Sequence, residues 1–152
     1  MTPTHRLNLA DVERVPVDAA MCRSLVAQAR RHRELAVAAR AIPDLVGGFQ
    51  VAYDGCRKVA LSVVLASGLR PKSAAHHKVT FDAAAALVAR HRNGAEASAI
   101  KKSLDDATDL RQIRAGSEYR AEEVTAANLE DAVAILDELL DALPALLDQL
   151  LA

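Results

Sequence analysis

Hydrophobic residues recur at alternating spacings of four and three in the middle of the chain, which predicts a helix from near Pro43 to Ala66. This apolar seam consists of Leu45, Phe49, Ala52, Cys56, Val59, Val63 and Ala66. Beyond Val59 the opposite side carries Leu61 and Leu65, so we expect that end of the helix to be covered all round. A helix that is apolar on every side, yet too short for a bilayer, is typical of the central rod of a bundle.

Three glycines interrupt this predicted central helix, namely Gly47, Gly48 and Gly55. Glycine lowers helix propensity, so each of them could mark a place where another backbone approaches closely. The helix should stop at Gly68, which can supply a C-terminal cap, before Pro71 blocks its continuation.

Further helices are predicted on either side of this rod. The first runs from Pro16, a residue favoured in the opening turn, to about Ala41. A third ends at about His91, and a fourth begins near Ala97. Residues 1–15 lack a clean period and are interpreted as an N-terminal arm.

The last predicted helix repeats the alternation of four and three through seven leucine or valine positions. Thr125 or Asn128 is its expected cap. Pro144 interrupts the pattern, and an interior proline costs about 3 kcal/mol, so we expect a kink or a fresh start there. The last seam consists of Leu129, Val133, Leu136, Leu140, Leu143, Leu147 and Leu150.

Composition agrees with this pattern. The 152 residues are 51% hydrophobic and only 3% aromatic, and the many alanines and leucines are strong helix formers. We therefore expect one all-α domain over residues 16–152. The formal net charge is -1, which indicates no overall electrostatic attraction to nucleic acid or to a membrane.

The cysteines and histidines of the sequence argue against a disulfide bond and against a metal site. Cys22 and Cys56 both lie in apolar helical contexts, and we interpret them as reduced core thiols of a cytoplasmic protein. The adjacent His76 and His77 would point about 100° apart on a helix, which does not suit two metal ligands. We expect no metal site, no cofactor and no membrane-spanning segment.

Arginines of the first helix form a basic stripe, and the outer face of the last helix is acidic. The stripe is either a solvated face or a partner for the acidic helix, or else a ridge that contacts phosphates. Its members are Arg23, Arg30, Arg33 and Arg40.

The fourth helix carries the most informative polar group. Its apolar stripe of Ile100, Leu104 and Ala107 is continued on the same side by Arg111, Arg114 and Glu118. Charges that extend a buried stripe are costly unless they pair or face a wet cleft.

Three stretches of the chain resemble the HEPN domains, a family of helical domains of higher eukaryotes and prokaryotes that bind nucleotides. Residues 52–60 read AYDGCRKVA, similar to the family's AYDAxRKA, and are followed by GLR at 68–70. The histidine pair opens the next helix. Residues 110–119 read LRQIRAGSEY, similar to RxxRNxxEY. Their order and spacing, over about residues 16–145, resemble most closely a compact actinobacterial type.

The resemblance implies an up-and-down bundle of four to five helices, commonly a homodimer with a cleft between subunits. Many HEPN domains are metal-independent ribonucleases, often toxins in toxin–antitoxin or antiviral systems, and some pair with a nucleotidyltransferase. Their signature is an arginine that neutralises the phosphate, then four to six residues, then a histidine that moves the proton. Here Arg114 matches the arginine, Ala115 replaces the usual asparagine, and Tyr119 stands where the histidine would. Tyrosine, with an ordinary pKa of about 10, is a poor base but can donate a hydrogen bond.

We therefore expect a dimer cleft that binds RNA or a nucleotide phosphate. The catalytic candidates are Arg114, Tyr119 and Glu118, with Tyr119 or His77 moving the proton if RNA is cut. The candidates for binding phosphate are Arg111, Arg57, Lys58, Tyr53 and His77. The expected partners are a second copy of the chain, RNA or a nucleotide, and an antitoxin or nucleotidyltransferase.

An alternative stays open, in which the protein is a catalytically inactive HEPN-like scaffold. Arg111, Arg114 and Glu118 would then form a structural ion-pair network, because such pairs are common at helical spacings of three and four.

Overall fold

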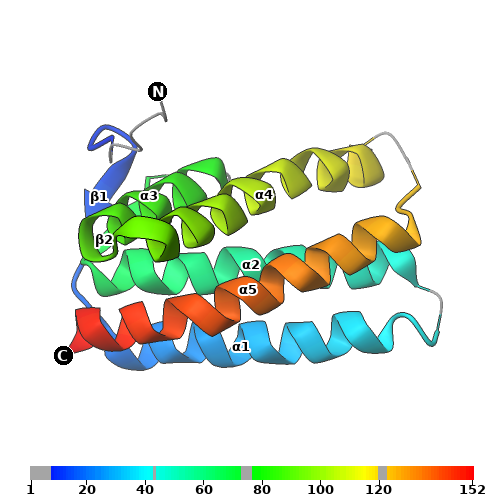
Figure 1. The fold of residues 1–152 in the computed structure, drawn as a ribbon, viewed down its shortest axis with the longest axis horizontal. Coiled ribbons are helices and arrows are strands. Elements are labelled where there is room, and N and C mark those ends of the chain that lie inside the picture. The colour runs from blue at the N-terminus through cyan, green and yellow to red at the C-terminus, as the bar shows by residue number, and fades with distance from the viewer. Residues whose placement is uncertain (1–7, 43, 73–76, 120–122) are drawn as a thin grey trace.

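The computed structural model describes residues 8–42, 44–72, 77–119 and 123–152, without the side chains of residues 117–119. Five helices form the bundle: α1 (Ala19–Ala38), α2 (Leu45–Ala66), α3 (His77–His91), α4 (Gly94–Tyr119) and α5 (Ala126–Leu151). The all-α bundle predicted from the sequence is confirmed. Figure 1 shows α1, α2, α4 and α5 extended along the same long direction, with the shorter α3 beside α4.

Side chains just outside the helices set where they begin. Asp18 accepts a hydrogen bond from the Met21 amide, so α1 begins at Ala19, three residues after the predicted Pro16. Asp44 caps α2 in the same way through the Gly47 amide. Thr125 and Asn128 form a reciprocal capping box at the start of α5.

The helix α2 is the central rod that the sequence predicts, because it packs against each of the other four helices. Its seam is buried from Phe49 to Ala66, and Leu45 at the start is half-buried. The expectation that Leu61 and Leu65 are covered all round is wrong, since both are only half-buried. One stripe of α2 is therefore open.

A two-stranded antiparallel ribbon accompanies the helices. Strand β1 (Val12–Arg14) pairs with β2 (Leu69–Pro71), and Glu13 faces Arg70 in the register. Gly68, with φ of +81°, turns the chain from α2 into β2, and its carbonyl accepts a hydrogen bond from the Val15 amide. The arm expected over residues 1–15 is thus wrong for residues 12–14. The ribbon lies at the end of the bundle where α5 ends (Figure 1).

The later helices differ from expectation at two places. Helix α4 begins at Gly94, whose φ is +61°, three residues before the predicted Ala97. Helix α5 runs without interruption through Pro144, so the expected fresh start is wrong. Leu143 and Leu147, on either side of this proline in the sequence, share one face of α5 and are both buried in the core.

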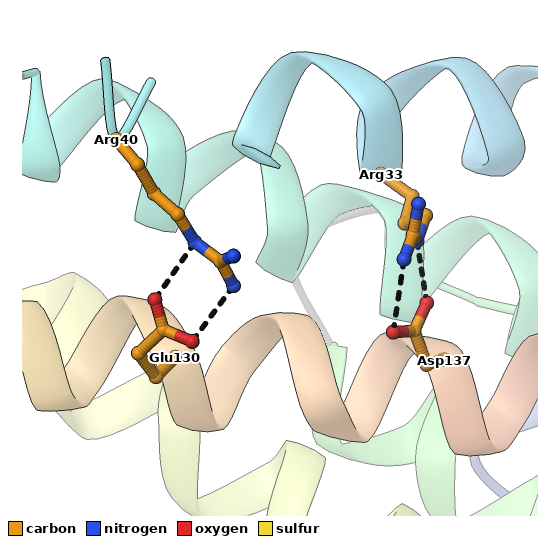
Figure 2. A network of polar contacts seen from close by, with 4 residues as sticks. All are labelled: Arg33, Arg40, Glu130 and Asp137. Atoms are coloured by element: carbon orange, nitrogen blue, oxygen red, sulfur yellow. Dashed lines mark hydrogen bonds and ion pairs between the residues drawn. The ribbon is translucent and has the colours of Figure 1, made fainter. Parts of the chain in front are cut away.

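A ladder of ion pairs joins α1 to α5. Arg33 meets Asp137 at 2.7 Å and Arg40 meets Glu130 at 2.7 Å, as Figure 2 shows, and Arg23 meets Asp148 at 2.7 Å. The step of seven residues from Arg33 to Arg40, which lies two residues beyond the end of α1, is matched by seven residues back along α5. Three of the four arginines of the basic stripe, Arg23, Arg33 and Arg40, therefore pair with the acidic helix, as one of the interpretations predicted. No helix in the described parts of the chain is long and apolar enough to cross a membrane.

Candidate functional site

Three helices bring polar side chains together around Tyr53. This tyrosine of α2 is fully buried, and its hydroxyl lies 2.9 Å from Nδ1 of His77, the first residue of α3. The ring of Phe81 meets the tyrosine edge-on, with centroids 6.2 Å apart. His77 and Phe81 are four residues apart and so share one face of α3. The start of α3 is thereby fixed on the tyrosine ring by a polar and an apolar contact.

Arg114 reaches the same tyrosine from α4. Its guanidinium carbon Cζ lies 5.4 Å from the centroid of the Tyr53 ring, within the range of a cation–π contact. Arg114 is half-buried, whereas Arg111, one turn earlier, is exposed. Of the two arginines that continue the apolar stripe of this helix, Arg114 thus lies against Tyr53, and Arg111 lies on the exposed surface of the single chain.

Arg57 and Asp54 extend the cluster along α2. Arg57 Nε and Asp54 Oδ1 are 3.9 Å apart, too far for a hydrogen bond but close enough for charge attraction. The Arg57 Nε atom is buried and has no hydrogen-bond partner among the described residues. We name Tyr53, Arg57, His77, Arg111 and Arg114 the arginine–histidine cluster. Its guanidinium groups provide donors for an anion at the junction of α2, α3 and α4.

Burial and charge set the protonation states within the cluster. Burial raises the pKa of Tyr53 to about 12, although the cationic Arg114 and Arg111 oppose this rise. Burial lowers the pKa of His77, and the positive charges of Arg57 and Arg114 lower it further. At neutral pH the pair therefore consists of a neutral phenol and a neutral imidazole.

Because its imidazole is neutral at pH 7, His77 is available to accept a proton, although the nearby guanidinium groups make it a weaker base. The Tyr53 hydroxyl can donate to or accept from Nδ1, so it tolerates either imidazole tautomer. The described residues place no hydrogen-bond partner on Nε2, the other ring nitrogen of His77. The arrangement can thus hold an anion on the arginines and exchange a proton through His77.

Lys58 does not join the cluster, although the sequence analysis placed it among the phosphate-binding candidates. Its Nζ lies 2.9 Å from Gln28 Oε1 and 2.9 Å from His32 Nε2, both on α1. Burial lowers the pKa of His32, and the charge of Lys58 lowers it further. The neutral imidazole can therefore accept a hydrogen bond from Lys58 Nζ. The ammonium group therefore links α2 to α1.

Two of the predicted catalytic side chains, Glu118 and Tyr119, lie outside the residues whose side chains are described. Phe81 and His32 are site neighbours that were not predicted from the sequence. The spacing of four between His77 and Phe81 could have indicated that Phe81 packs on the same partner. Nothing in the local sequence pairs His32 with Lys58, because the two meet only when α1 and α2 pack.

No group of three or more His, Cys, Asp or Glu side chains that could hold a metal ion occurs in the described part of the chain. Both cysteines are buried and free. In comparisons with known proteins, no family model, no curated protein and no solved structure matches this chain.

Proposed function

We propose that this protein binds a phosphate group of RNA at the arginine–histidine cluster. The observation that carries the proposal is the guanidinium of Arg114 stacked over Tyr53, whose hydroxyl contacts His77 at 2.9 Å. Residues from three helices, distant in sequence, meet there with cationic donors and a neutral imidazole. Arginine is the side chain best suited to phosphate, because its planar fork offers two parallel hydrogen bonds.

The proposal includes a HEPN-like homodimer in which a second copy of the chain closes the cluster into a cleft. Its support is the meeting of two of the motifs that carry the resemblance: residues 52–60 supply Tyr53 and Arg57, and residues 110–119 supply Arg114. Sedimentation of the purified protein tests the dimer. An antitoxin or a nucleotidyltransferase is the further partner that the same resemblance suggests.

The proposal extends to cleavage of the bound RNA. His77, neutral at pH 7, would accept the proton of a ribose 2′-hydroxyl while its oxygen attacks the adjacent phosphorus. Arg114 would stabilise the negative charge that develops on the phosphate oxygens. The bond to the 5′-oxygen then breaks, that oxygen takes a proton from water, and a 2′,3′-cyclic phosphate and a 5′-hydroxyl are left.

Binding is tested by fluorescence anisotropy with a labelled single-stranded RNA. The variant Arg114→Gln should weaken binding by about tenfold or more, because a charge-assisted contact to phosphate is lost. Arg90→Gln is the matched control, since Arg90 is exposed on α3, thirteen residues from His77, and its loss changes net charge equally. Equal weakening by both variants would show nonspecific attraction and overturn the assigned site.

Cleavage is tested with the same RNA and with a copy that carries one 2′-deoxyribose. The mechanism requires the 2′-hydroxyl, so cutting should stop at the deoxy position while binding continues. The variant His77→Gln should lose cleavage and keep most of the binding. Cleavage that persists at the deoxy position, or in His77→Gln, would exclude this chemistry.

A second candidate function is an inactive scaffold, and one observation favours it. The contact of Arg114 with Tyr53 also ties α4 to α2, so the arginine can serve packing alone. Under this alternative Arg114→Gln lowers stability by about 0.5–2 kcal/mol, the value of a cation–π contact, and the wild-type protein shows no saturable binding of RNA or nucleotide.

A further inference from the structure

A second feature of the molecule lies beside the arginine–histidine cluster and is not explained by it. A cavity of about 360 Å³ opens between α1, α2, α3 and the β1–β2 ribbon. This volume falls within the range of about 300–1,000 Å³ that is usual for small-molecule pockets. Its lining residues are Glu13, Met21, Arg57, Leu61, Leu65, Arg70, Pro71, Lys72 and Thr80.

Aliphatic side chains form the wall of this cavity. Leu61 and Leu65 lie one turn apart on the open stripe of α2, a helix whose other faces are buried. Met21 of α1 faces them with 52% of its surface exposed. Isolated exposed apolar residues are ordinary, but three that meet in one concave site leave a surface that an apolar ligand would cover.

Basic side chains gather at the same cavity. Its lining contains Arg57, Arg70 and Lys72 against a single acid, Glu13. Glu13 pairs with Arg70 at 2.6 Å across the ribbon, and the buried Nε of Arg57 has no hydrogen-bond partner among the described residues. The cavity therefore has an excess of positive charge and an unused donor beside its apolar wall.

We propose that this cavity binds a small anionic molecule with an aliphatic body, such as a carboxylate on a short hydrocarbon chain. The chain would lie against Met21, Leu61 and Leu65, and the anionic head would face Arg57 and Lys72. Among the lining residues that the structure describes there is no aromatic ring, so a nucleobase would find no stacking partner. The ligand is thus distinct from the RNA proposed for the neighbouring cluster.

Titration calorimetry with octanoate tests this assignment, and octanol, of the same chain length without the charge, is the matched probe. Octanoate should bind saturably, and octanol about tenfold more weakly or less, because it lacks the charge-assisted contacts. The variant Leu65→Trp should abolish binding by filling the cavity. Met21→Trp should do the same, and since Met21 is half exposed this second variant keeps the test valid if Leu65→Trp fails to fold.

A pair of arginine variants separates a local effect from a general effect of charge. Arg70→Gln should weaken octanoate binding several-fold, because it leaves the Glu13 carboxylate unpaired at the cavity, where it repels the anionic head. Arg23→Gln should leave binding unchanged, because its partner Asp148 does not line the cavity. The two arginines are matched, because each is 57% exposed and each pairs with a carboxylate. Equal binding of octanoate and octanol, unchanged binding in both tryptophan variants, or no saturable binding would overturn the proposal.

The cavity and the RNA site share Arg57, but Arg114 belongs to the RNA site alone, so its variant separates the two proposals. Arg114→Gln should leave octanoate binding unchanged, because Arg114 does not line this cavity. If the wild-type protein binds RNA but not octanoate, the cavity proposal alone is refuted. If it binds octanoate but not RNA, the RNA-site proposal alone is refuted.

Discussion

The Tyr53 hydroxyl and His77 Nδ1 lie 2.9 Å apart across the interface of α2 and α3, although 24 residues separate them in the chain. The phenol is fully buried, so its polar atom needs this partner. The bond couples the start of α3 to the centre of the bundle, and it orients the imidazole that the proposed chemistry uses.

The variant Tyr53→Phe should lower the free energy of unfolding by about 1 kcal/mol, because it removes this buried hydrogen bond while the ring packing on Phe81 is kept. Urea denaturation measures the loss. In a double-mutant cycle with His77→Ala the two costs should not add, since both changes break one contact. Strict additivity would show that the hydroxyl and the imidazole do not stabilise each other.

Stability should fall on the acid side of neutrality. The pKa values of His77 and His32 are both lowered from 6.5 by burial and by neighbouring positive charges, so the unfolded chain takes up protons first as pH falls. The contribution of these two histidines to the free energy of unfolding should therefore be complete above pH 6.5. It should decrease as the pH falls from 6.5 through their lowered pKa values. Denaturation at several pH values checks the slope.

Imidazole titration by NMR assigns this acid effect to each histidine. The His77 signal should titrate below pH 6.5 in the free protein, and bound phosphate should move its midpoint upward because a nearby anion favours the imidazolium. A midpoint at or above 6.5 without phosphate would contradict the burial and charge environment described above.

Two glycines of α2 should respond differently to alanine. A Cβ on Gly48 would lie 2.7 Å from the Ala39 Cβ, and one on Gly55 would lie 2.8 Å from Cδ2 of Leu136. The Ala39 methyl moves only with its backbone, whereas the leucine can change rotamer. Gly48→Ala should therefore destabilise by about 1–3 kcal/mol, the usual cost of overpacking, and Gly55→Ala by less. Thermal unfolding ranks the two, and the opposite order would contradict the close approach of α1.

The ion-pair ladder between α1 and α5 offers a charge-swap test. Arg33→Asp and Asp137→Arg should each reduce stability, and the double variant should recover most of the loss, because their pairing is restored with reversed sign. Each side chain is more than 40% exposed, so the interaction itself should be worth only about 0.2–1 kcal/mol. High salt should shrink the effect, and no recovery in the double variant would count against direct pairing.

The thiols of Cys22 and Cys56 should be inert in the native protein. Both are fully buried, and burial raises the pKa of each thiol, which keeps the reactive thiolate scarce. A disulfide-forming reagent should modify both at the rate of unfolding, and immediately in denaturant. Fast reaction without denaturant would show that α1 opens away from α2.

The helices could be predicted from the sequence because a helix depends on the hydrophobic pattern and the caps within its own segment. The alternation of four and three along α2 and α5 needs no knowledge of neighbours, and the caps Asp18 and Thr125 act within three residues. The β1–β2 ribbon could not be predicted in this way, because its strands are three residues long and pair across 57 residues of sequence. Such a short segment has too few positions to show a period.

By itself, the sequence determined an all-α bundle around α2 and indicated reduced cysteines. It left open whether the basic stripe pairs with the acidic helix, and packing decided that it does. Only tertiary packing decided that Arg114 rests on Tyr53, that Lys58 bonds to His32, and that Leu61 and Leu65 face a cavity. The physical reason is the distance along the chain over which each kind of interaction acts. Helical periodicity and capping are fixed within a turn or two, whereas the partner of a charge depends on how separate helices rotate against each other.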